Sequence, residues 1–327
     1  MAKRKLSHQQ RRRIAGHKER LRQGDTVAAE DDALGTHCEG LVVTRYGKQA
    51  DVLALPLAPG AQPVRCHIRA NLGDLVTGDR VIWRPGEPTG VVESVLPRNT
   101  LMSRPDTQGQ LRPVVANVDQ IAVVFAPEPA PHQNLIDRYL VAIEQLGIEP
   151  LLIFNKMELD PTGQLADLLG LYRRLGYTLL SVSAKQGLGL DALAAALRDR
   201  VTVLVGQSGA GKSSLINRIH PEAEAATGEL SLVAKGRHTT TAARFYVLSE
   251  GGCLIDSPGI REFGLIHLDR EQIAAGFVEF RPWLGTCRFR DCRHRDEPGC
   301  SIVEAFEAGK ISAERLASYH HIIADMG

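Results

Sequence analysis

Residues 201–214 read VTVLVGQSGAGKSS, and this stretch decides the fold of the central part of the chain. Its first five residues have the β-branched, apolar character of a buried strand, and the segment SSLINRI has the periodicity of a helix. Between them, GQSGAGKS matches G-x-x-x-x-G-K-[ST] in the strand–loop–helix context that this pattern requires. We therefore predict a P-loop, a glycine-rich turn whose backbone N–H groups and following helix N-terminus bind nucleotide phosphates.

The residue types in this loop predict individual roles. Lys212 is expected to neutralise the β- and γ-phosphates, and Ser213 to place its hydroxyl on Mg²⁺. The loop does not by itself distinguish ATP from GTP. The expected phosphate-binding residues are Gly206, Gln207, Ser208, Gly209, Ala210, Gly211, Lys212, Ser213 and Ser214.

A second motif indicates that the base is guanine. The apolar run PLLIF is followed by NKME at 155–158, close to the guanine-reading pattern N-K-x-D. In that pattern the carboxylate accepts hydrogen bonds from guanine N1–H and the 2-amino group, and adenine would leave it unpaired. Glu158 has the charge of Asp and one more methylene, so we expect the guanine preference to survive. Asp160 lies nearby, but its spacing from Asn155 is wrong.

A short segment after the run YTLLSV completes the expected base site. SAK at 183–185 resembles the element in which a backbone N–H meets guanine O6. Three residues occur often by chance, so this assignment depends on the neighbouring motifs. The expected base-binding residues are Asn155, Lys156, Met157, Glu158, Ser183, Ala184 and Lys185.

Two further segments predict the Mg²⁺ shell and the γ-phosphate contact. DSPG at 256–259 follows an apolar run, so Asp256 is expected to hold Mg²⁺ through water and the Gly259 N–H to contact the γ-phosphate. The polar loop GRHTTT at 236–241 is expected to supply Thr240 as the remaining Mg²⁺ ligand, although it could be a merely solvated loop. The expected magnesium ligands are Ser213, Thr240 and Asp256.

Catalysis needs a group that orients the attacking water. Ras-like proteins use a Gln just after D-x-x-G, but this chain has Ile260 there, which cannot hydrogen-bond. His238 is the available polar candidate, and the alternative is that it only caps its loop. The expected catalytic residues are Lys212, His238 and Thr240.

The order of these motifs is unusual. Apolar runs alternate with helical patterns from residue 117, which is typical of a mostly parallel sheet with ligands at the carboxyl ends of its strands. The base motifs precede the P-loop, whereas small GTPases have the P-loop first. We therefore predict a circularly permuted α/β GTPase domain over 113–270, in which DSPG leads directly into the C-terminal region.

The N-terminal part differs in pattern and charge. Five short strands broken by Gly, Pro and Asp predict a small barrel of the OB-fold type over 36–112. Residues 1–22 hold nine Lys or Arg and one Glu, while the remaining chain has 30 basic and 37 acidic residues, so the tail over 1–35 is expected to bind a polyanion or to be simply solvated. A basic stacking face is expected from Arg45, Tyr46, Arg69, Trp83 and Arg84, with a core position as the alternative for Trp83.

The C-terminal part, 271–327, contains the metal-ligand spacing C-x₄-C-x-H-x₅-C, followed by helical patterns. Four N and S ligands suit tetrahedral Zn²⁺, and a filled shell predicts a structural site in a small helical zinc-binding domain. The expected ligands are Cys287, Cys292, His294 and Cys300. The neighbouring arginines could contact RNA phosphates or be ordinary surface, and they are Arg288, Arg290, Arg293 and Arg295.

No apolar run approaches the roughly 18 residues of a membrane span. The basic start lacks the apolar stretch of a signal peptide, so we expect a cytoplasmic protein without membrane contact, and a monomer.

Together the motifs resemble the family of circularly permuted bacterial GTPases called ribosome small-subunit-dependent GTPase A. The resemblance covers nearly the whole chain and is carried by four nucleotide motifs, GQSGAGKSS, GRHTTT, DSPG and NKME, and by the cysteine–histidine cluster. It implies binding of GTP and GDP, late maturation of the 30S ribosomal subunit near the decoding region of 16S rRNA, and hydrolysis stimulated by the subunit. A His in GRHTTT is a catalytic candidate in that family, which favours His238, while the base-reading residue is usually Asp rather than Glu158.

Two other functions remain open on the sequence: a P-loop phosphotransferase acting on a small metabolite, and a non-enzymatic RNA-binding protein that holds nucleotide. The first would need a substrate pocket or lid, whereas the extra length of this chain forms a predicted barrel and a predicted zinc module. Turnover with and without ribosomal subunits distinguishes the three.

Overall fold

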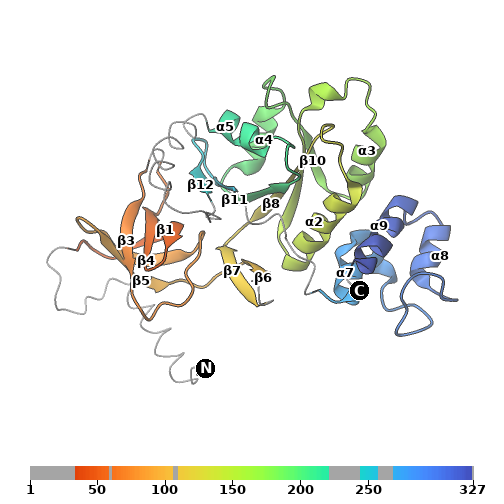
Figure 1. The fold of residues 1–327 in the computed structure, drawn as a ribbon, viewed down its shortest axis with the longest axis horizontal. Coiled ribbons are helices and arrows are strands. Elements are labelled where there is room, and N and C mark those ends of the chain that lie inside the picture. The colour runs from red at the N-terminus through yellow and green to blue at the C-terminus, as the bar shows by residue number, and fades with distance from the viewer. Residues whose placement is uncertain (1–33, 59–60, 106–109, 221–243, 257–267, 326–327) are drawn as a thin grey trace.

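The computed structural model describes residues 34–58, 61–105, 110–220, 244–256 and 268–325 (Figure 1). In Figure 1 the N-terminal barrel and the C-terminal helices lie at opposite ends of a central α/β unit, which consists of the strands β8–β13 and the helices α2–α5. None of the helices in the described ranges combines the length and the hydropathy of a membrane span.

The N-terminal part is a closed five-stranded barrel with the strand order β1-β2-β3-β5-β4, as expected for an OB-fold. Its only parallel pair among these strands is β3 with β5, and Trp83 lies in the core with 2% of its surface exposed. Trp83 is therefore a packing residue and not part of a stacking surface. The strands are β1 (Cys38–Tyr46), β2 (Gln49–Ala54), β3 (Val64–Ile68), β4 (Arg80–Arg84) and β5 (Gly90–Val95).

An antiparallel hairpin, which the expected elements do not include, follows the barrel. It pairs β6 (Leu101–Pro105) with β7 (Leu111–Ala116). The barrel and the hairpin approach closely at Gly78, where an added Cβ would lie 2.1 Å from the Ala116 carbonyl oxygen. The Asn117 side-chain amide donates to the Gly78 carbonyl at 2.8 Å, and the Ala116 N–H donates to the Thr77 carbonyl at 2.9 Å, so hydrogen bonds join the two parts.

A six-stranded sheet forms the central unit, with the order β10-β9-β8-β11-β13-β12. All neighbouring pairs are parallel except β12 with β13. The P-loop strand β11 is therefore central, although three parallel strands precede it in the chain, and this confirms the expected circular permutation. The strands are β8 (Gln120–Phe125), β9 (Glu149–Phe154), β10 (Thr178–Ser181), β11 (Val201–Gly206), β12 (Arg244–Val247) and β13 (Cys253–Asp256).

Helices cover both faces of this sheet because its strands are apolar on both sides. Along β8, Val123 contributes to one buried cluster and Val124 to the other. The first cluster includes residues of α2 (Gln133–Leu146) and α3 (Ala166–Arg174). The second includes residues of α4 (Leu190–Leu197) and α5 (Lys212–Ile219), while a short 3₁₀ helix, η1 (Met157–Leu159), follows β9.

The C-terminal unit consists of α7 (Arg270–Gly276), η4 (Val278–Trp283), α8 (Ser301–Glu307) and α9 (Ala313–Ala324). Asp269 and Gln272 form a capping box at the start of α7, and Ser312 caps α9. The core of this unit contains Phe277, Phe280 and Tyr319, but it also takes in Val141 of α2. The unit thus completes its core against the central unit.

Candidate nucleotide site and metal centre

The predicted phosphate-binding loop lies between the end of β11 and the start of α5. Gly206 and Gly211 have φ values of 134° and 91°, which side-chain-bearing residues rarely adopt. An added Cβ on Gly206 would lie 2.1 Å from the Val124 carbonyl oxygen, and one on Gly211 would lie 2.4 Å from the Asn155 Nδ2. Both glycines are therefore required by close neighbours as well as by backbone conformation.

Asn155 joins three of the predicted segments. Its side chain is buried, with 1% of the residue exposed. The amide nitrogen donates to the Ala210 carbonyl at 3.0 Å, and the amide oxygen accepts from the Ala184 N–H at 3.2 Å. The P-loop, the NKME segment and the SAK segment, which lie far apart in the sequence, therefore meet at one side chain.

The expected base-reading carboxylate has an unsatisfied atom. Glu158 Oε2 is buried and has no hydrogen-bond partner among the described residues. A buried acceptor without a partner is costly, so this oxygen is suited to a donor supplied by a ligand. Asp160, in contrast, has both carboxylate oxygens satisfied, because they accept from the Gln164 N–H at 2.7 Å and the Leu165 N–H at 3.1 Å.

The other base-site residues are held by local contacts. Lys156 has a φ of 58°, and its ammonium donates to the Glu128 carbonyl at 2.7 Å. The Met157 N–H donates to the Val182 carbonyl at 3.1 Å. Ser183 is buried and its hydroxyl accepts from the Gln186 N–H at 2.9 Å, which shapes the turn that carries Ala184 and Lys185.

The phosphate-side residues lie at the same edge of the sheet. The Lys212 ammonium donates to the carbonyls of Gly206 at 2.7 Å and Gln207 at 2.9 Å, so it lies across the loop. Ser213 and Ser214 are exposed on the first turn of α5. Asp256 is the last residue of β13 and pairs in register with Leu204 of β11, next to the P-loop.

Several expected site residues lie outside the described residues. These are His238 and Thr240 of the GRHTTT loop and Gly259 of DSPG, together with the basic tail up to residue 33.

The four expected metal ligands come together in the segment between η4 and α8. All four ligand atoms lie within 4.8 Å of one another. His294 Nδ1 is 3.5 Å from the Cys287 sulfur and 3.4 Å from the Cys300 sulfur, and these two sulfurs are 4.0 Å apart. Metal–ligand bonds of about 2.0–2.3 Å in a tetrahedron give ligand separations of about 3.5–3.8 Å. The donor set and its spacing therefore fit a single metal ion such as Zn²⁺.

Two other cysteines have a different environment. Burial raises the pKa of the Cys66 thiol to about 12, and it does the same for Cys253. Neither lies in a group of potential metal ligands among the described residues. They behave as small core residues.

The metal-ligand segment has supports that the spacing of its cysteines does not reveal. Glu297 accepts hydrogen bonds from the N–H groups of Arg293 at 2.8 Å and Arg295 at 2.9 Å. The His320 ring lies 2.6 Å from the His294 carbonyl oxygen, and His294 has a φ of 57°. Gly, Asn and Asp are the residue types that indicate a left-handed backbone in a sequence. The left-handed backbone of His294 and its hydrogen-bond partner His320 could therefore not be predicted.

The two expected nucleic-acid surfaces are exposed in part. The arginines beside the metal ligands are all exposed, and Phe289, with 44% of its surface exposed, lies under the Arg288 guanidinium at 5.5 Å. On the barrel, Tyr46 is 43% exposed and stacks with Arg65 at 4.6 Å. Arg69 and Arg84 instead surround the buried Glu93 carboxylate, at 2.7 Å and 4.0 Å.

Comparisons with known proteins agree with this site. The RsgA GTPase family matches residues 95–266. A small ribosomal subunit biogenesis GTPase RsgA from Ectopseudomonas mendocina is 51% identical over 100% of this chain and 98% of its own. One from Chromohalobacter salexigens is 52% identical over 99% of this chain and 98% of its own.

Two solved structures are also similar. YjeQ from Thermotoga maritima has a TM-score of 0.72 and 30% identity, covering 89% of this chain and 98% of its own. YloQ, described as a circularly permuted GTPase, has a TM-score of 0.70 and 26% identity, covering 91% of this chain and 98% of its own. These matches confirm the expected fold and identify a GTP-hydrolysing enzyme. The chain therefore belongs to the RsgA GTPase family.

Proposed function

We propose that this chain hydrolyses GTP while it promotes late maturation of the small ribosomal subunit, and that the subunit stimulates hydrolysis. The observation that carries the proposal is the meeting of the P-loop, NKME and SAK segments at Asn155. The partner is inferred from two relatives named small ribosomal subunit biogenesis GTPases. They are 51% and 52% identical to this chain over 98% of their own length.

Guanine is proposed to lie between the NKME and SAK segments. Glu158 would accept hydrogen bonds from guanine N1–H and the 2-amino group. These bonds would give the buried, unpartnered Oε2 of Glu158 a donor. The stem of Lys156 would cover the base plane, and a backbone N–H of the SAK segment would face guanine O6. Asn155 would keep these segments in register with the P-loop.

Glu158→Gln should change the preferred base from guanine to xanthine. A glutamine amide presents an N–H group to the 2-amino group of guanine, a donor facing a donor, whereas xanthine has a carbonyl oxygen at that position. We expect GTP affinity to fall about 10–10²-fold and XTP to bind more tightly than GTP, because a hydrogen bond to a charged group contributes about 1.5–3 kcal/mol. Calorimetric titration with both nucleotides measures this.

The matched control is Asp160→Asn. This variant removes the same charge from a carboxylate that bonds its own loop, and its amide oxygen can still accept from the Gln164 N–H. We therefore expect its base preference to be unchanged. Retention of the guanine preference in Glu158→Gln would show that another residue reads the base.

Catalysis is proposed to use Mg²⁺ and an ordered water. Ser213, in the first turn of α5, and Asp256, at the end of the strand that pairs with β11, fit as oxygen ligands, and Thr240 is proposed as the third. When bound, Mg²⁺ would neutralise charge on the β- and γ-phosphates. Lys212 would hold the same phosphates, the Gly259 N–H would contact the γ-phosphate, and His238 would orient the attacking water in place of the absent glutamine.

A single structural Zn²⁺ is proposed for the cysteine–histidine cluster. Cys287, Cys292 and Cys300 with His294 would fill a tetrahedral shell and leave no open position for substrate. The proposed contacts with 16S rRNA are the basic tail, the exposed arginines of this segment and the barrel. We further propose that the protein acts in the cytoplasm, because its proposed partner is a ribosomal subunit, and that it acts as a monomer.

GTP turnover titrated with purified small subunits tests the proposed function. Slow intrinsic hydrolysis that rises at least about tenfold with subunits is expected, and His238→Ala should lower the stimulated rate by about 10²-fold if it orients water. Turnover that is indifferent to subunits would exclude the subunit as partner, and phosphorylation of a small acceptor would indicate a phosphotransferase. Absence of turnover under every condition would indicate a nucleotide-holding RNA-binding protein.

A further inference from the structure

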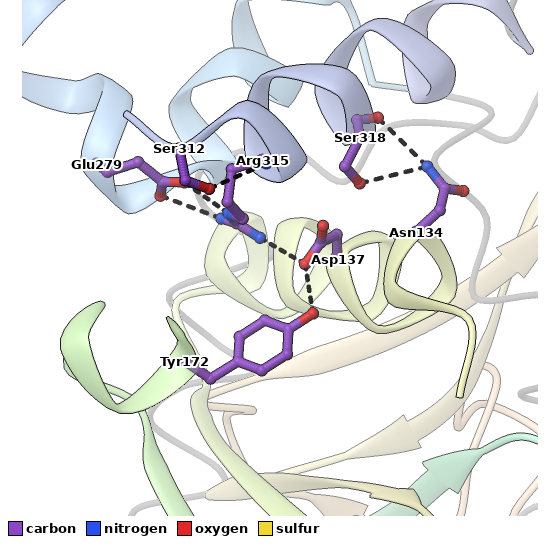
Figure 2. A network of polar contacts seen from close by, with 7 residues as sticks. All are labelled: Asn134, Asp137, Tyr172, Glu279, Ser312, Arg315 and Ser318. Atoms are coloured by element: carbon purple, nitrogen blue, oxygen red, sulfur yellow. Dashed lines mark hydrogen bonds and ion pairs between the residues drawn. The ribbon is translucent and has the colours of Figure 1, made fainter. Parts of the chain in front are cut away.

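The contact between the C-terminal unit and the central unit contains a buried charge. Arg315 of α9 has no exposed surface, and its guanidinium donates to Asp137 Oδ1 of α2 at 2.6 Å (Figure 2). It also donates to both carboxylate oxygens of Glu279, at 2.5 Å and 3.1 Å. The guanidinium stacks on Phe277 at 4.4 Å. One cation thus holds one carboxylate from each unit.

The charge states of this cluster follow from its surroundings. Burial by itself lowers the pKa of Arg315, but the carboxylates of Asp137 and Glu279 raise it by a larger amount. The net pKa is above the ordinary value, so the guanidinium stays charged. Burial and then Asp137 raise the pKa of Tyr172, so its hydroxyl remains a donor and bonds Asp137 Oδ1 at 2.8 Å. Tyr172 lies on α3, so the Asp137 carboxylate of α2 bonds both α3 and α9 (Figure 2).

The surrounding contacts are close but individually weaker. An added Cβ on Gly276 of α7 would lie 2.7 Å from Val141 Cγ1, so the two helices touch directly. Asn134 bonds the backbone carbonyl and hydroxyl oxygens of Ser318, both at 3.3 Å. At the rim, Arg281 pairs with Glu144 at 2.6 Å, but 47% of the Arg281 side chain is exposed. An exposed pair contributes little, whereas breaking a buried one leaves an uncompensated charge.

The helix that receives Arg315 also lies beside the P-loop. A small cavity is lined by Leu135 and Ile136 from the first turns of α2 and by Gly206 and Gln207 of the phosphate loop. Asp137 follows Ile136 directly in the sequence. The phosphate loop and the docking point of the C-terminal unit therefore lie within about one turn of the same helix.

We propose that Arg315 docks the C-terminal unit onto α2, and that this contact couples the unit to the nucleotide site. The coupling rests on the proposed nucleotide binding, while the docking does not. Nucleotide contacts would order the phosphate loop and the first turn of α2, which would make undocking of α9 rarer. Such coupling is reciprocal, so a firmly docked unit would favour bound nucleotide. This route is distinct from the direct chain connection through residues 257–267.

Amide hydrogen exchange of the full-length protein, with and without GDP and Mg²⁺, tests both parts. In nucleotide-free Arg315→Met, peptides of α7 and α9 should exchange about 10²-fold faster than in the wild type, because Asp137 and Glu279 are left buried without their cation. The matched control Arg281→Met, which removes the exposed pair, should change exchange less than about fivefold. Arg315→Met/Asp137→Asn should exchange more slowly than Arg315→Met, since one uncompensated charge is gone.

The metal content of each variant separates undocking from unfolding. Arg315→Met is expected to keep one metal ion per chain, and if it loses the ion, Gly276→Ala gives a second test, because its methyl group separates α7 from α2 without removing a charge. In the wild type, GDP should slow exchange in α9 about five- to 150-fold, and this effect should vanish in Arg315→Met.

Three outcomes overturn the proposal. Wild-type exchange rates of α9 in both Arg315→Met and Gly276→Ala would refute the docking. Protection of 206–214 by GDP without any change in α9 would refute the coupling. No protection of 206–214 would refute nucleotide binding itself, and the coupling with it, while the nucleotide-free comparison would still decide the docking.

Discussion

Lys212→Ala is expected to weaken GTP binding about 10²- to 10⁴-fold. The Lys212 ammonium lies across the phosphate loop, 2.7 Å and 2.9 Å from the Gly206 and Gln207 carbonyl oxygens, where β- and γ-phosphates would bind. Charge-assisted hydrogen bonds to two phosphates contribute about 1.5–3 kcal/mol each. Equilibrium titration with a fluorescent GTP analogue measures the change.

The matched control is Arg218→Ala on the same helix. Arg218 is exposed and lies in the last turn of α5, so its removal takes the same charge from the helix without touching the loop. We expect this variant to bind GTP within about threefold of the wild type, because solvent and salt screen the charge of an exposed side chain. Unchanged affinity of Lys212→Ala would show that 206–214 does not bind the phosphates.

Cys300→Ser is expected to abolish metal binding and to unfold the C-terminal unit. The Cys300 side chain is buried at the start of α8 and lies in the core of that unit. Structural zinc supplies about 10–16 kcal/mol in small domains that cannot fold without it. Metal content should therefore fall from one ion per chain to nearly none, and α7, α8 and α9 should lose protection from hydrogen exchange.

Cys66→Ala is the control for loss of a buried cysteine. Cys66 lies in the barrel core, with no exposed surface, and a thiol whose pKa burial raises to about 12. We expect it to cost some barrel stability and to leave the metal content at one ion per chain. Full metal content in Cys300→Ser would contradict the assignment of the four ligands.

Local patterns in the sequence predict the nucleotide-binding architecture well. The sequence of 201–219 indicates a strand, a glycine-rich turn and a helix in that order, and the structure has β11 and α5 at those positions. Parallel strands bring their carboxyl ends to one edge, so the order of motifs along the chain suffices to predict that they meet. The role of Asn155 as the contact between them depends on side-chain geometry and appears only in three dimensions.

Features that depend on distant partners could not be predicted. Arg315 lies in a helix whose pattern makes a charged residue look like exposed surface, yet it is fully buried because Asp137 and Glu279 meet it from other helices. Trp83 was compatible with a stacking surface or a core, and only closure of the barrel decides for the core. The hairpin of β6 and β7 contains Pro105 and Pro113, which weaken the strand signal.

The central claim is that motifs in permuted order form one guanine-nucleotide site. A crystal structure with a non-hydrolysable GTP analogue and Mg²⁺ tests it most directly. We expect the phosphates against the N–H groups of 206–214, the N1–H edge of guanine on Glu158, and Mg²⁺ near Ser213 and Asp256. A nucleotide bound elsewhere, or a guanine edge that does not face Glu158, would contradict it.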